Sequence, residues 1–220
     1  MYKHIVKRLI DLILSGVAIV VLAIPMLIVA VAIKIDDPGP VLFKQRRVGK
    51  KKNGEITYFM IWKFRSMKMS TPHDVPTHLL ENPEQYITRV GRIIRKTSID
   101  ELPQIYQVFT SRLSVVGPRP ALWSQKDLIE EREKYGANDI KPGITGWAQI
   151  NGRDELEIPV KAKLDGEYTA AINAGEFKGF AMDMKCLLGT VASVLKSDGV
   201  VEGGTGAMNK EEDEKEAVHQ

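Results

Sequence analysis

The chain has 220 residues, a formal net charge of +3 and a single cysteine, Cys186. This length suits one domain plus an accessory segment. One cysteine excludes an intrachain disulfide, which fits a reducing compartment. With four scattered histidines and no second cysteine, a structural zinc cluster is not expected either.

Residues 9–33 form an apolar run in which Asp11 is the one charged side chain. The run exceeds the roughly 20 helical residues that cross a bilayer. No small-residue cleavage site follows it, so we expect a retained anchor rather than a signal peptide. Pro25 lies inside the run, and proline breaks or kinks a helix because it lacks an N–H and clashes with the preceding turn. Lysine and arginine flank both ends, so their usual cytoplasmic bias selects no orientation. The alternatives are a kinked spanning helix and a re-entrant helix that returns to the cytoplasmic side.

Two β-strands are predicted after the anchor, over residues 41–48 and 57–67. Between them, Asn53-Gly54 is a dipeptide that favours the positive φ angles of a hairpin turn. The sequence therefore predicts an antiparallel β-hairpin.

Positive charge is concentrated in this hairpin. Residues 41–70 contain nine lysines and arginines against one acid, whereas residues 208–220 carry five acids and two lysines. Alternate residues share one face of a strand, so Lys63 and Arg65 should point the same way. That face is either solvated or a cradle for phosphate groups.

The rest of the chain is predicted to be mainly helical. Residues 69–83 contain three prolines and predict a loop, and residues 115–120 predict a stiff one. The last helix has a broad apolar face that suits either the core or a membrane interface. The expected helices cover residues 85–95, 100–112, 121–135, 155–174 and 180–196. The chain is therefore predicted to be a mixed α/β protein with an N-terminal membrane segment and interfacial amphipathic helices.

Asp100 and Glu101 are adjacent carboxylates next to a basic stretch. One interpretation is a capping box, with Ser98 as the N-cap and Glu101 three residues later. Pro103 favours Asp100 as the N-cap instead, because proline costs little among the first helical positions. A carboxylate can also attack phosphorus, provided that Mg²⁺ and basic side chains neutralise the phosphate charge. The basic residues available for this are Lys63, Arg65, Arg95 and Arg119.

Four strings then follow one another along the chain: KFRSM at 63–67, SIDELPQ at 98–104, SVVGPRP at 114–120 and KPGITGWAQINGR at 141–153. Together with the basic and apolar N-terminal segment, they resemble the bacterial sugar transferase family, the monotopic polyprenyl-phosphate phosphoglycosyl transferases. The likeness extends over nearly the whole chain, to about residue 201.

The resemblance implies a domain organisation and a reaction. Residues 1–36 would form a re-entrant helix–break–helix anchor with its break at Pro25, residues 37–201 a small α/β catalytic domain, and residues 202–220 a flexible acidic tail. The enzyme would transfer a phospho-sugar from a UDP-sugar to polyprenyl (undecaprenyl) phosphate, giving polyprenyl-diphosphate-sugar and UMP. This would be the first membrane step of a surface glycan pathway, at the cytoplasmic face of the bacterial plasma membrane.

The resemblance also implies residue roles. Asp100 would be the nucleophile of a ping-pong reaction through a covalent aspartyl-phosphosugar intermediate, and it would contact the Mg²⁺ that the family requires. Glu101 would assist proton transfer from the lipid phosphate. The residues expected to hold phosphate or substrate are Lys63, Arg65, Arg95, Arg119, Gln149 and Arg153.

The expected partners are the UDP-sugar, polyprenyl phosphate and membrane lipids, and the amphipathic helices could also support a homodimer. Nucleic acid is not expected, because the basic run lacks the interleaved exposed aromatics of a single-strand binder. The alternative class is a membrane-tethered, non-catalytic protein that binds anionic lipid or nucleic acid through the basic hairpin.

The sequence departs from the family pattern at two positions. Ile24 precedes Pro25 where many members have serine, so the bend lacks one hydroxyl partner for its freed backbone groups. Arg112 stands where members often have an acid, which puts any metal-binding or ion-pairing role of that acid in doubt.

Overall fold

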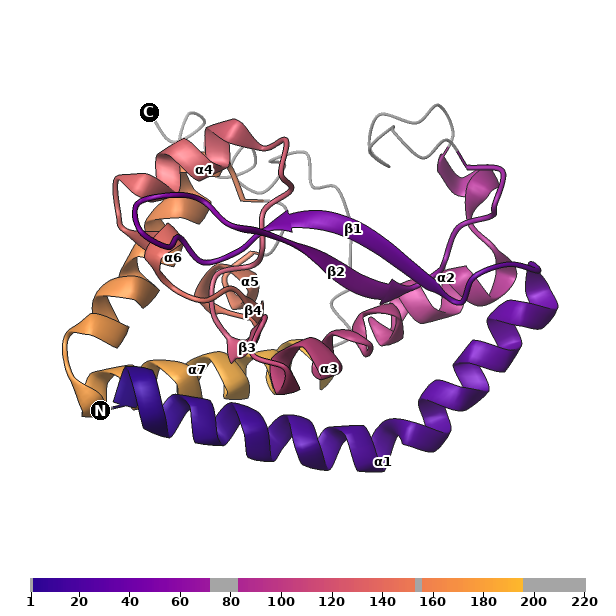
Figure 1. Ribbon diagram of the computed structural model, residues 1–220, viewed down its shortest axis with the longest axis horizontal. Helices are drawn as coiled ribbons and strands as arrows, with labels where there is room; N and C mark the ends of the chain where they lie inside the picture. Colours follow the sequence, from indigo (N-terminus) through magenta and orange to yellow (C-terminus); the bar gives the residue numbers. More distant parts are fainter. Residues whose placement is uncertain (1, 72–82, 153–155, 196–220) are drawn as a thin grey trace, which may run out of the picture.

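The structure is a computed structural model that describes residues 2–71, 83–152 and 156–195. A long N-terminal helix runs beneath a body of two short sheets and several helices (Figure 1). The predicted mixture of helix and sheet is therefore confirmed. Arg153 and the predicted acidic tail at 202–220 lie outside the described residues.

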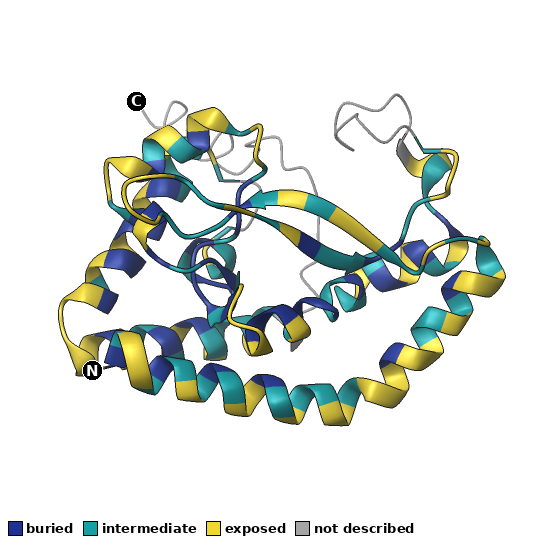
Figure 2. Cartoon of the chain, in the orientation of Figure 1, coloured by how far each residue is buried: buried dark blue, intermediate teal, exposed yellow. Residues whose placement is uncertain are grey.

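The apolar run forms one continuous helix, α1 (Lys7–Asp36), preceded by a π-helical turn, η1 (Tyr2–Val6). Pro25 lies inside α1 and does not end it, so one helix stands where a helix–break–helix was expected. Figure 1 shows that α1 bends along its length. It is the one helix of the described residues that is long and apolar enough to cross a membrane, with a mean hydropathy of 3.0 over its most apolar stretch. Only 11% of that stretch is buried, and much of its outer surface is exposed (Figure 2).

The N-terminal part of α1 is fixed to the body by buried charges. Lys7 Nζ lies 2.7 Å from the Asp183 carboxylate. Asp11 accepts hydrogen bonds from Ser114 Oγ at 2.9 Å and from the Val115 N–H at 2.9 Å. These two donors explain why one acid is tolerated in the apolar run, since a buried carboxylate needs hydrogen-bond partners.

The C-terminal end of α1 rests on the same body. The Asp36 carboxylate accepts a 2.8 Å hydrogen bond from the Val90 N–H, and Ile33 packs in a buried apolar cluster with Phe64 and Ile94. Both ends of the apolar helix are therefore held by one folded unit.

The predicted hairpin is confirmed. Strands β1 (Leu42–Val48) and β2 (Tyr58–Phe64) pair antiparallel, and Asn53 and Gly54 both have the positive φ angles that their dipeptide predicts. Two basic side chains of β1 lie over aromatic rings. Lys44 Nζ is 5.8 Å from the Trp62 ring centroid, and the Arg46 guanidinium is 4.3 Å from that of Tyr58.

A second sheet was not predicted. Strands β3 (Ser114–Val116) and β4 (Gly143–Thr145) pair parallel, and β3 overlaps the stiff loop that was expected at 115–120. Each strand has three residues, too few to show a period-2 pattern in the sequence.

All five predicted helices are confirmed, with shifted bounds: α2 (Arg89–Lys96), α3 (Gln104–Phe109), α4 (Lys126–Glu133), α6 (Ile158–Asn173) and α7 (Glu176–Leu195). Shorter helical segments accompany them: η3 (Pro83–Tyr86), η4 (Ile99–Glu101), η5 (Ala137–Asp139) and α5 (Trp147–Ile150).

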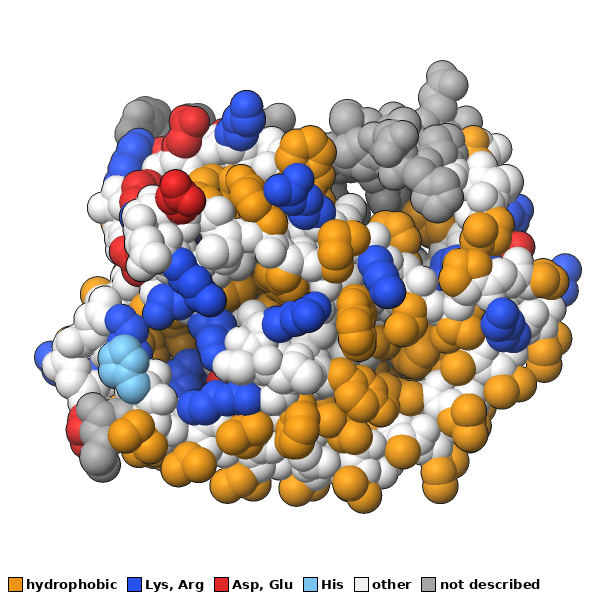
Figure 3. All heavy atoms as spheres, viewed as in Figure 1, with side chains coloured by type: hydrophobic (Ala, Val, Ile, Leu, Met, Phe, Trp, Pro, Cys, Tyr) orange, Lys and Arg blue, Asp and Glu red, His pale blue; other side chains and the backbone are white. Residues whose placement is uncertain are grey.

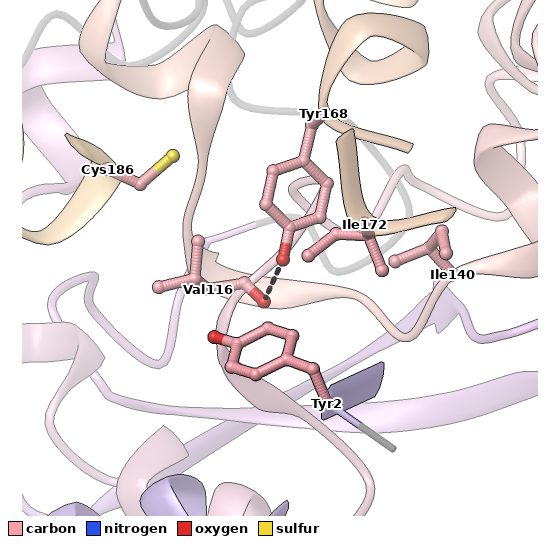
Figure 4. Packing of buried hydrophobic residues seen from close by; sticks show 6 residues of the cluster. All are labelled: Tyr2, Val116, Ile140, Tyr168, Ile172 and Cys186. Atoms are coloured by element: carbon pink, nitrogen blue, oxygen red, sulfur yellow. Dashed lines mark hydrogen bonds between the residues drawn. The ribbon is translucent and has the colours of Figure 1, made fainter. Parts of the chain in front are cut away.

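The main apolar cluster joins η1, β3, α6 and α7 (Figure 4). Tyr168 is fully buried there, and its hydroxyl donates to the Val116 carbonyl at 3.1 Å and to Asp183 Oδ1 at 2.8 Å. Cys186 is also buried, and burial together with the nearby Asp183 raises the pKa of its thiol to about 12. A thiol of that pKa is a packing group rather than a nucleophile.

Candidate active site

The two adjacent carboxylates lie on η4, between α2 and α3. Asp100 is 4% exposed. Both capping interpretations of the sequence are wrong. Ser98 adopts a left-handed conformation with φ 55° and makes no side-chain cap hydrogen bond, and the N-cap of α3 is Pro103 rather than Asp100. Neither carboxylate therefore serves as a helix N-cap or in a capping box.

Lys63 and Arg119 converge on these carboxylates from different elements. Lys63, on β2, places its Nζ 3.0 Å from Glu101 Oε1 and 3.8 Å from Asp100 Oδ2. Arg119 follows β3, and its Nη2 lies 2.8 Å from Glu101 Oε1. The predicted residues Lys63, Asp100, Glu101 and Arg119 therefore form one cluster, which we call the dyad cluster.

Glu101 is held as a carboxylate by its two cations. Burial alone would raise its pKa, but Arg119 and Lys63 outweigh burial, and the pKa of Glu101 lies well below its usual range. Glu101 is therefore ionised at neutral pH and binds both cationic side chains.

The position of β2, and hence of Lys63, is set by Gln107 on α3. The Gln107 Oε1 accepts a hydrogen bond from the Trp62 N–H at 2.9 Å, and its Nε2 donates to the Met60 carbonyl at 2.7 Å. These bonds satisfy backbone groups on the edge of β2 that has no partner strand. Sequence reasoning did not identify this residue, whose partners lie 45 and 47 residues away.

The loop that carries Arg119 packs backbone to backbone against the segment around β4. The Gly117 N–H donates to the Thr145 carbonyl at 2.8 Å. A Cβ at Gly143 would lie 2.1 Å from the Gly117 nitrogen, and one at Gly146 would lie 2.2 Å from the Gly117 oxygen. Only glycine permits these approaches, so the glycines of this segment fix the path of the loop to Arg119.

Gln149, a predicted substrate residue, lies beside this loop. A Cβ on Gly146 would be 2.8 Å from Gln149 Oε1 and also next to Gly117. Both polar atoms of the Gln149 amide are buried and have no hydrogen-bond partner among the described residues. Leaving a buried polar group unpaired costs about 1–3 kcal/mol. An amide left in this condition is suited to a ligand that supplies the missing partners.

Arg65 has partners other than those expected. Its Nε donates to the Pro40 carbonyl at 2.7 Å, and its guanidinium also binds Asp37. Arg65 is buried and fixes the segment through which the chain leaves α1. Its predicted phosphate-binding role gains no support from these contacts.

Arg95 is half-buried in the last turn of α2, a helix that contacts η4. Its carbonyl accepts the Ser98 N–H at 3.1 Å. Its predicted role with phosphate stays a prediction, as does that of Arg153, which lies outside the described residues.

The predicted magnesium ion would have to be shared between the protein and a substrate. Proteins usually hold Mg²⁺ through one or two carboxylates, and the substrate phosphates supply further oxygen ligands. In the part of the chain that the structure describes, no group of three or more His, Cys, Asp and Glu side chains could hold a metal ion. Asp100 would then be the one carboxylate ligand that the protein supplies, and this role stays a prediction.

Comparison with known proteins identifies the family. The profile of the bacterial sugar transferase family matches residues 2–197. The chain therefore belongs to the bacterial sugar transferase family, as the sequence motifs indicated.

The chain is similar to proteins from several bacteria. It is 38% identical over 196 residues to the uncharacterized sugar transferase EpsL of Bacillus subtilis, covering 89% of this chain and 90% of that protein. It is 38% identical over 203 residues to the exopolysaccharide production protein PSS of Rhizobium leguminosarum, covering 87% and 96%. It is 38% identical over 173 residues to the UDP-glucose:undecaprenyl-phosphate glucose-1-phosphate transferase of Escherichia coli, covering 76% of this chain but 36% of that longer protein.

Proposed function

We propose that this protein transfers a phospho-sugar from a UDP-sugar to polyprenyl phosphate and releases UMP. The observation that carries the proposal is a buried Asp100 beside Lys63, with Arg119 joined through Glu101. The names of relatives support it, since they include undecaprenyl-phosphate transferases of glucose-1-phosphate and of N-acetylgalactosamine phosphate.

The reaction would proceed in two displacements at one phosphorus. A carboxylate oxygen of Asp100 forms a bond to the sugar-bearing phosphorus, while the bond from that phosphorus to the UMP phosphate oxygen breaks. An oxygen of the lipid phosphate then attacks the same phosphorus. This step releases the Asp100 carboxylate and yields the polyprenyl-diphosphate-sugar. A covalent intermediate usually helps because it divides one difficult step into two easier ones.

Lys63 and Arg119 would stabilise the charge on the phosphoryl oxygens. Phosphoryl transfer depends mainly on positioning and on electrostatic stabilisation. The ion pairs to Glu101 hold both cationic groups in the dyad cluster before a substrate arrives, so little reorganisation would be needed during the reaction.

Glu101 is better suited to this holding role than to the proton transfer that the resemblance implies. A general base works best with a pKa near the working pH, whereas the pKa of Glu101 is held far below it by Arg119 and Lys63 against the effect of burial. The attacking lipid phosphate also needs no strong base, because its second pKa is near 6, as for other phosphate monoesters.

Mg²⁺ would bind through Asp100 and the donor diphosphate, where it would supply positive charge to the leaving phosphate. Gln149 and Arg95 would complete the substrate contacts, and the unpartnered amide of Gln149 supports its part in this assignment. Arg153 belongs to the same proposed set on its motif alone.

We further propose that residues 1–36 are a re-entrant anchor at the cytoplasmic face and that residues 37–201 form the catalytic domain. Both ends of α1 contact one folded unit, which supports a helix that enters and leaves on the same side. Figure 3 shows hydrophobic side chains along the edge where α1 lies. On α7, Phe177 and Leu188 are 83% and 70% exposed, which suits a helix at the membrane interface.

The anchor is tested by cysteine labelling. Single cysteines at Lys3 and Lys52, in a background without the buried Cys186, should react with a membrane-impermeant reagent from the same side. Labelling from opposite sides would show a spanning helix.

The reaction is tested with purified protein, a panel of UDP-sugars, undecaprenyl phosphate and Mg²⁺. We expect UMP release that requires both the lipid and one of the sugars. If the folded protein released no UMP with any donor but bound anionic vesicles, the non-catalytic alternative would hold.

A further inference from the structure

Gln104 is a buried amide next to the dyad cluster, and no role has been given to it above. The residue is 2% exposed, and its Nε2 has no hydrogen-bond partner among the described residues. Native proteins rarely leave a buried donor unsatisfied, because desolvation of the group is not compensated. This donor therefore requires an explanation.

Gln104 is the first residue of α3 and follows the dyad cluster closely along the chain. Leu102 and Pro103 have right-handed helical conformations that join η4 to α3. The backbone of this junction is bonded three residues apart, from the Leu102 N–H to the Ile99 carbonyl and from the Ile105 N–H to the Leu102 carbonyl, so Gln104 begins α3 one turn after Glu101. Asp100 and Gln104 are both buried, as is Gln107 one turn further on.

The buried face of α3 is turned toward β2. Gln107 is hydrogen-bonded to the Met60 and Trp62 backbone, and Lys63 Nζ lies 3.8 Å from the Asp100 carboxylate. Gln104 lies between these two contacts along the chain. Gln104 therefore lies within one turn of the dyad cluster, at the start of a helix that contacts β2.

We propose that Gln104 Nε2 donates a hydrogen bond to a non-bridging oxygen of the phosphoryl group while that group is transferred to and from Asp100. The inference rests on the proposed function and adds a catalytic residue to it. A neutral amide suits this role, because it offers a donor to the phosphoryl oxygen without adding to the charge of the two cations. The donor is buried and has no competing partner in the described part of the chain, so it is available when charge develops on that oxygen.

Gln107 provides a matched control on the same helix. Both glutamines are buried on one face of α3, but both polar atoms of Gln107 are bonded to backbone groups of β2. Methionine has a similar shape to glutamine and no amide. Replacement by methionine should therefore lower stability at a structural glutamine and lower activity at a substrate-binding one.

The experiment compares Gln104→Met, Gln104→Glu and Gln107→Met with the wild type. Gln104→Met should retain or gain thermal stability, because it removes an unsatisfied buried donor. Its kcat and kcat/KM for UMP release should both fall by about 10²–10³-fold, the effect of losing one preorganised donor to a transition state. Gln104→Glu, with an oxygen in place of the donor nitrogen, should not restore activity. Gln107→Met should lower the melting temperature, because two β2 backbone groups lose their partners.

The inference would be overturned by a Gln104→Met protein that keeps wild-type kcat per folded molecule, whatever its melting temperature. This result would leave the proposed function intact, since the wild type would still release UMP.

Failure of the proposed function would look different, because the wild type itself would then release no UMP. In that case inorganic phosphate serves as the probe, in melting curves recorded without Mg²⁺. Stabilisation of the wild type but not of Gln104→Met would support phosphate recognition by Gln104. Equal stabilisation of both proteins, or of neither, would refute it.

Discussion

Two buried clusters of charge in this protein differ in how completely they are satisfied. The anchor cluster consists of Tyr2, Lys7, Tyr168 and Asp183. The Asp183 carboxylate receives the Tyr2 hydroxyl at 2.5 Å, Lys7 Nζ at 2.7 Å and the Tyr168 hydroxyl at 2.8 Å. Three donors from three elements thus surround one acid, and the cluster fastens the start of α1 to α6 and α7.

The dyad cluster has a different balance. Its two cations share Glu101, and Asp100 is buried beside Lys63. Gln104, which follows this cluster along the chain, and Gln149, beside the loop that leads to Arg119, have buried amide atoms without a described partner. Buried polar networks hold a fold when they are complete. An incomplete one costs stability, which is the expected property of a site preorganised for a ligand. This difference supports a structural role for the anchor cluster and the proposed catalytic role for the dyad cluster.

The largest expected effect is that of Asp100→Asn. Replacing the nucleophile should lower kcat by at least about 10⁴-fold, while the melting temperature should change little or rise, because a buried charge is removed. UMP release and thermal melting measure both quantities. Wild-type turnover in this variant would move the nucleophile elsewhere and remove the distinction between the two clusters.

Asp183→Leu tests the structural role of the anchor cluster. It leaves Lys7 without its carboxylate, and breaking a buried pair costs about 3–5 kcal/mol of unfolding free energy. Activity per folded molecule should stay near the wild-type value. The double variant Lys7→Met with Asp183→Leu should recover part of the lost stability, because no unpaired charge remains. A loss of kcat without a loss of stability would contradict the structural assignment.

Lys63→Met should lower kcat by about 10²–10³-fold, the range for removing one stabilising group from a transition state. Lys44→Met is the matched control. It removes a lysine of the same hairpin that lies over the Trp62 ring rather than beside a carboxylate. Its kcat should stay close to that of the wild type. Equal losses from both variants would indicate a general effect of hairpin charge, such as lipid binding.

The smallest expected effect is a pH dependence of stability. The folded-state pKa of Glu101 is lowered because Arg119 and Lys63 outweigh burial, so the stability that Glu101 contributes is fully present above its unfolded pKa of about 4.3. It is lost as the pH falls from there through the folded value. The difference in unfolding free energy between the wild type and Glu101→Gln should therefore be constant from pH 5 to 8 and shrink below about pH 4.5. A difference that changed near neutral pH would show that Glu101 titrates there.

The sequence predicted the features that depend on local signals. Asn53-Gly54 predicted the hairpin, and the apolar run predicted α1. Long-range partners had no such signal. Lys63 and Arg65 are both basic and two residues apart. Arg65 is bound by Asp37, 28 residues away, so of these two residues Lys63 alone joins the dyad cluster. The capping predictions for Ser98 and Asp100 failed because the left-handed Ser98 ends one turn and Pro103 begins the next.

Gln104 and Gln149, whose buried amide atoms have no partner among the described residues, show the same limit of local sequence signals. Gln149 was predicted through the family resemblance alone, and Gln104 stood in a recognised string without a role. Nothing in the local sequence distinguishes Gln104 from Gln107. The difference is that the β2 backbone supplies hydrogen-bond partners to the Gln107 amide and none to Gln104 Nε2.

The central claim is that the Asp100 carboxylate becomes bonded to phosphorus. Intact-mass spectrometry of the wild type after incubation with UDP-sugar and Mg²⁺ alone, under a quench shown to preserve acyl phosphates, tests it directly. We expect one added phospho-sugar on the wild type and none on Asp100→Asn. A wild-type protein that stays unmodified under these conditions while it releases UMP in the complete reaction would contradict it.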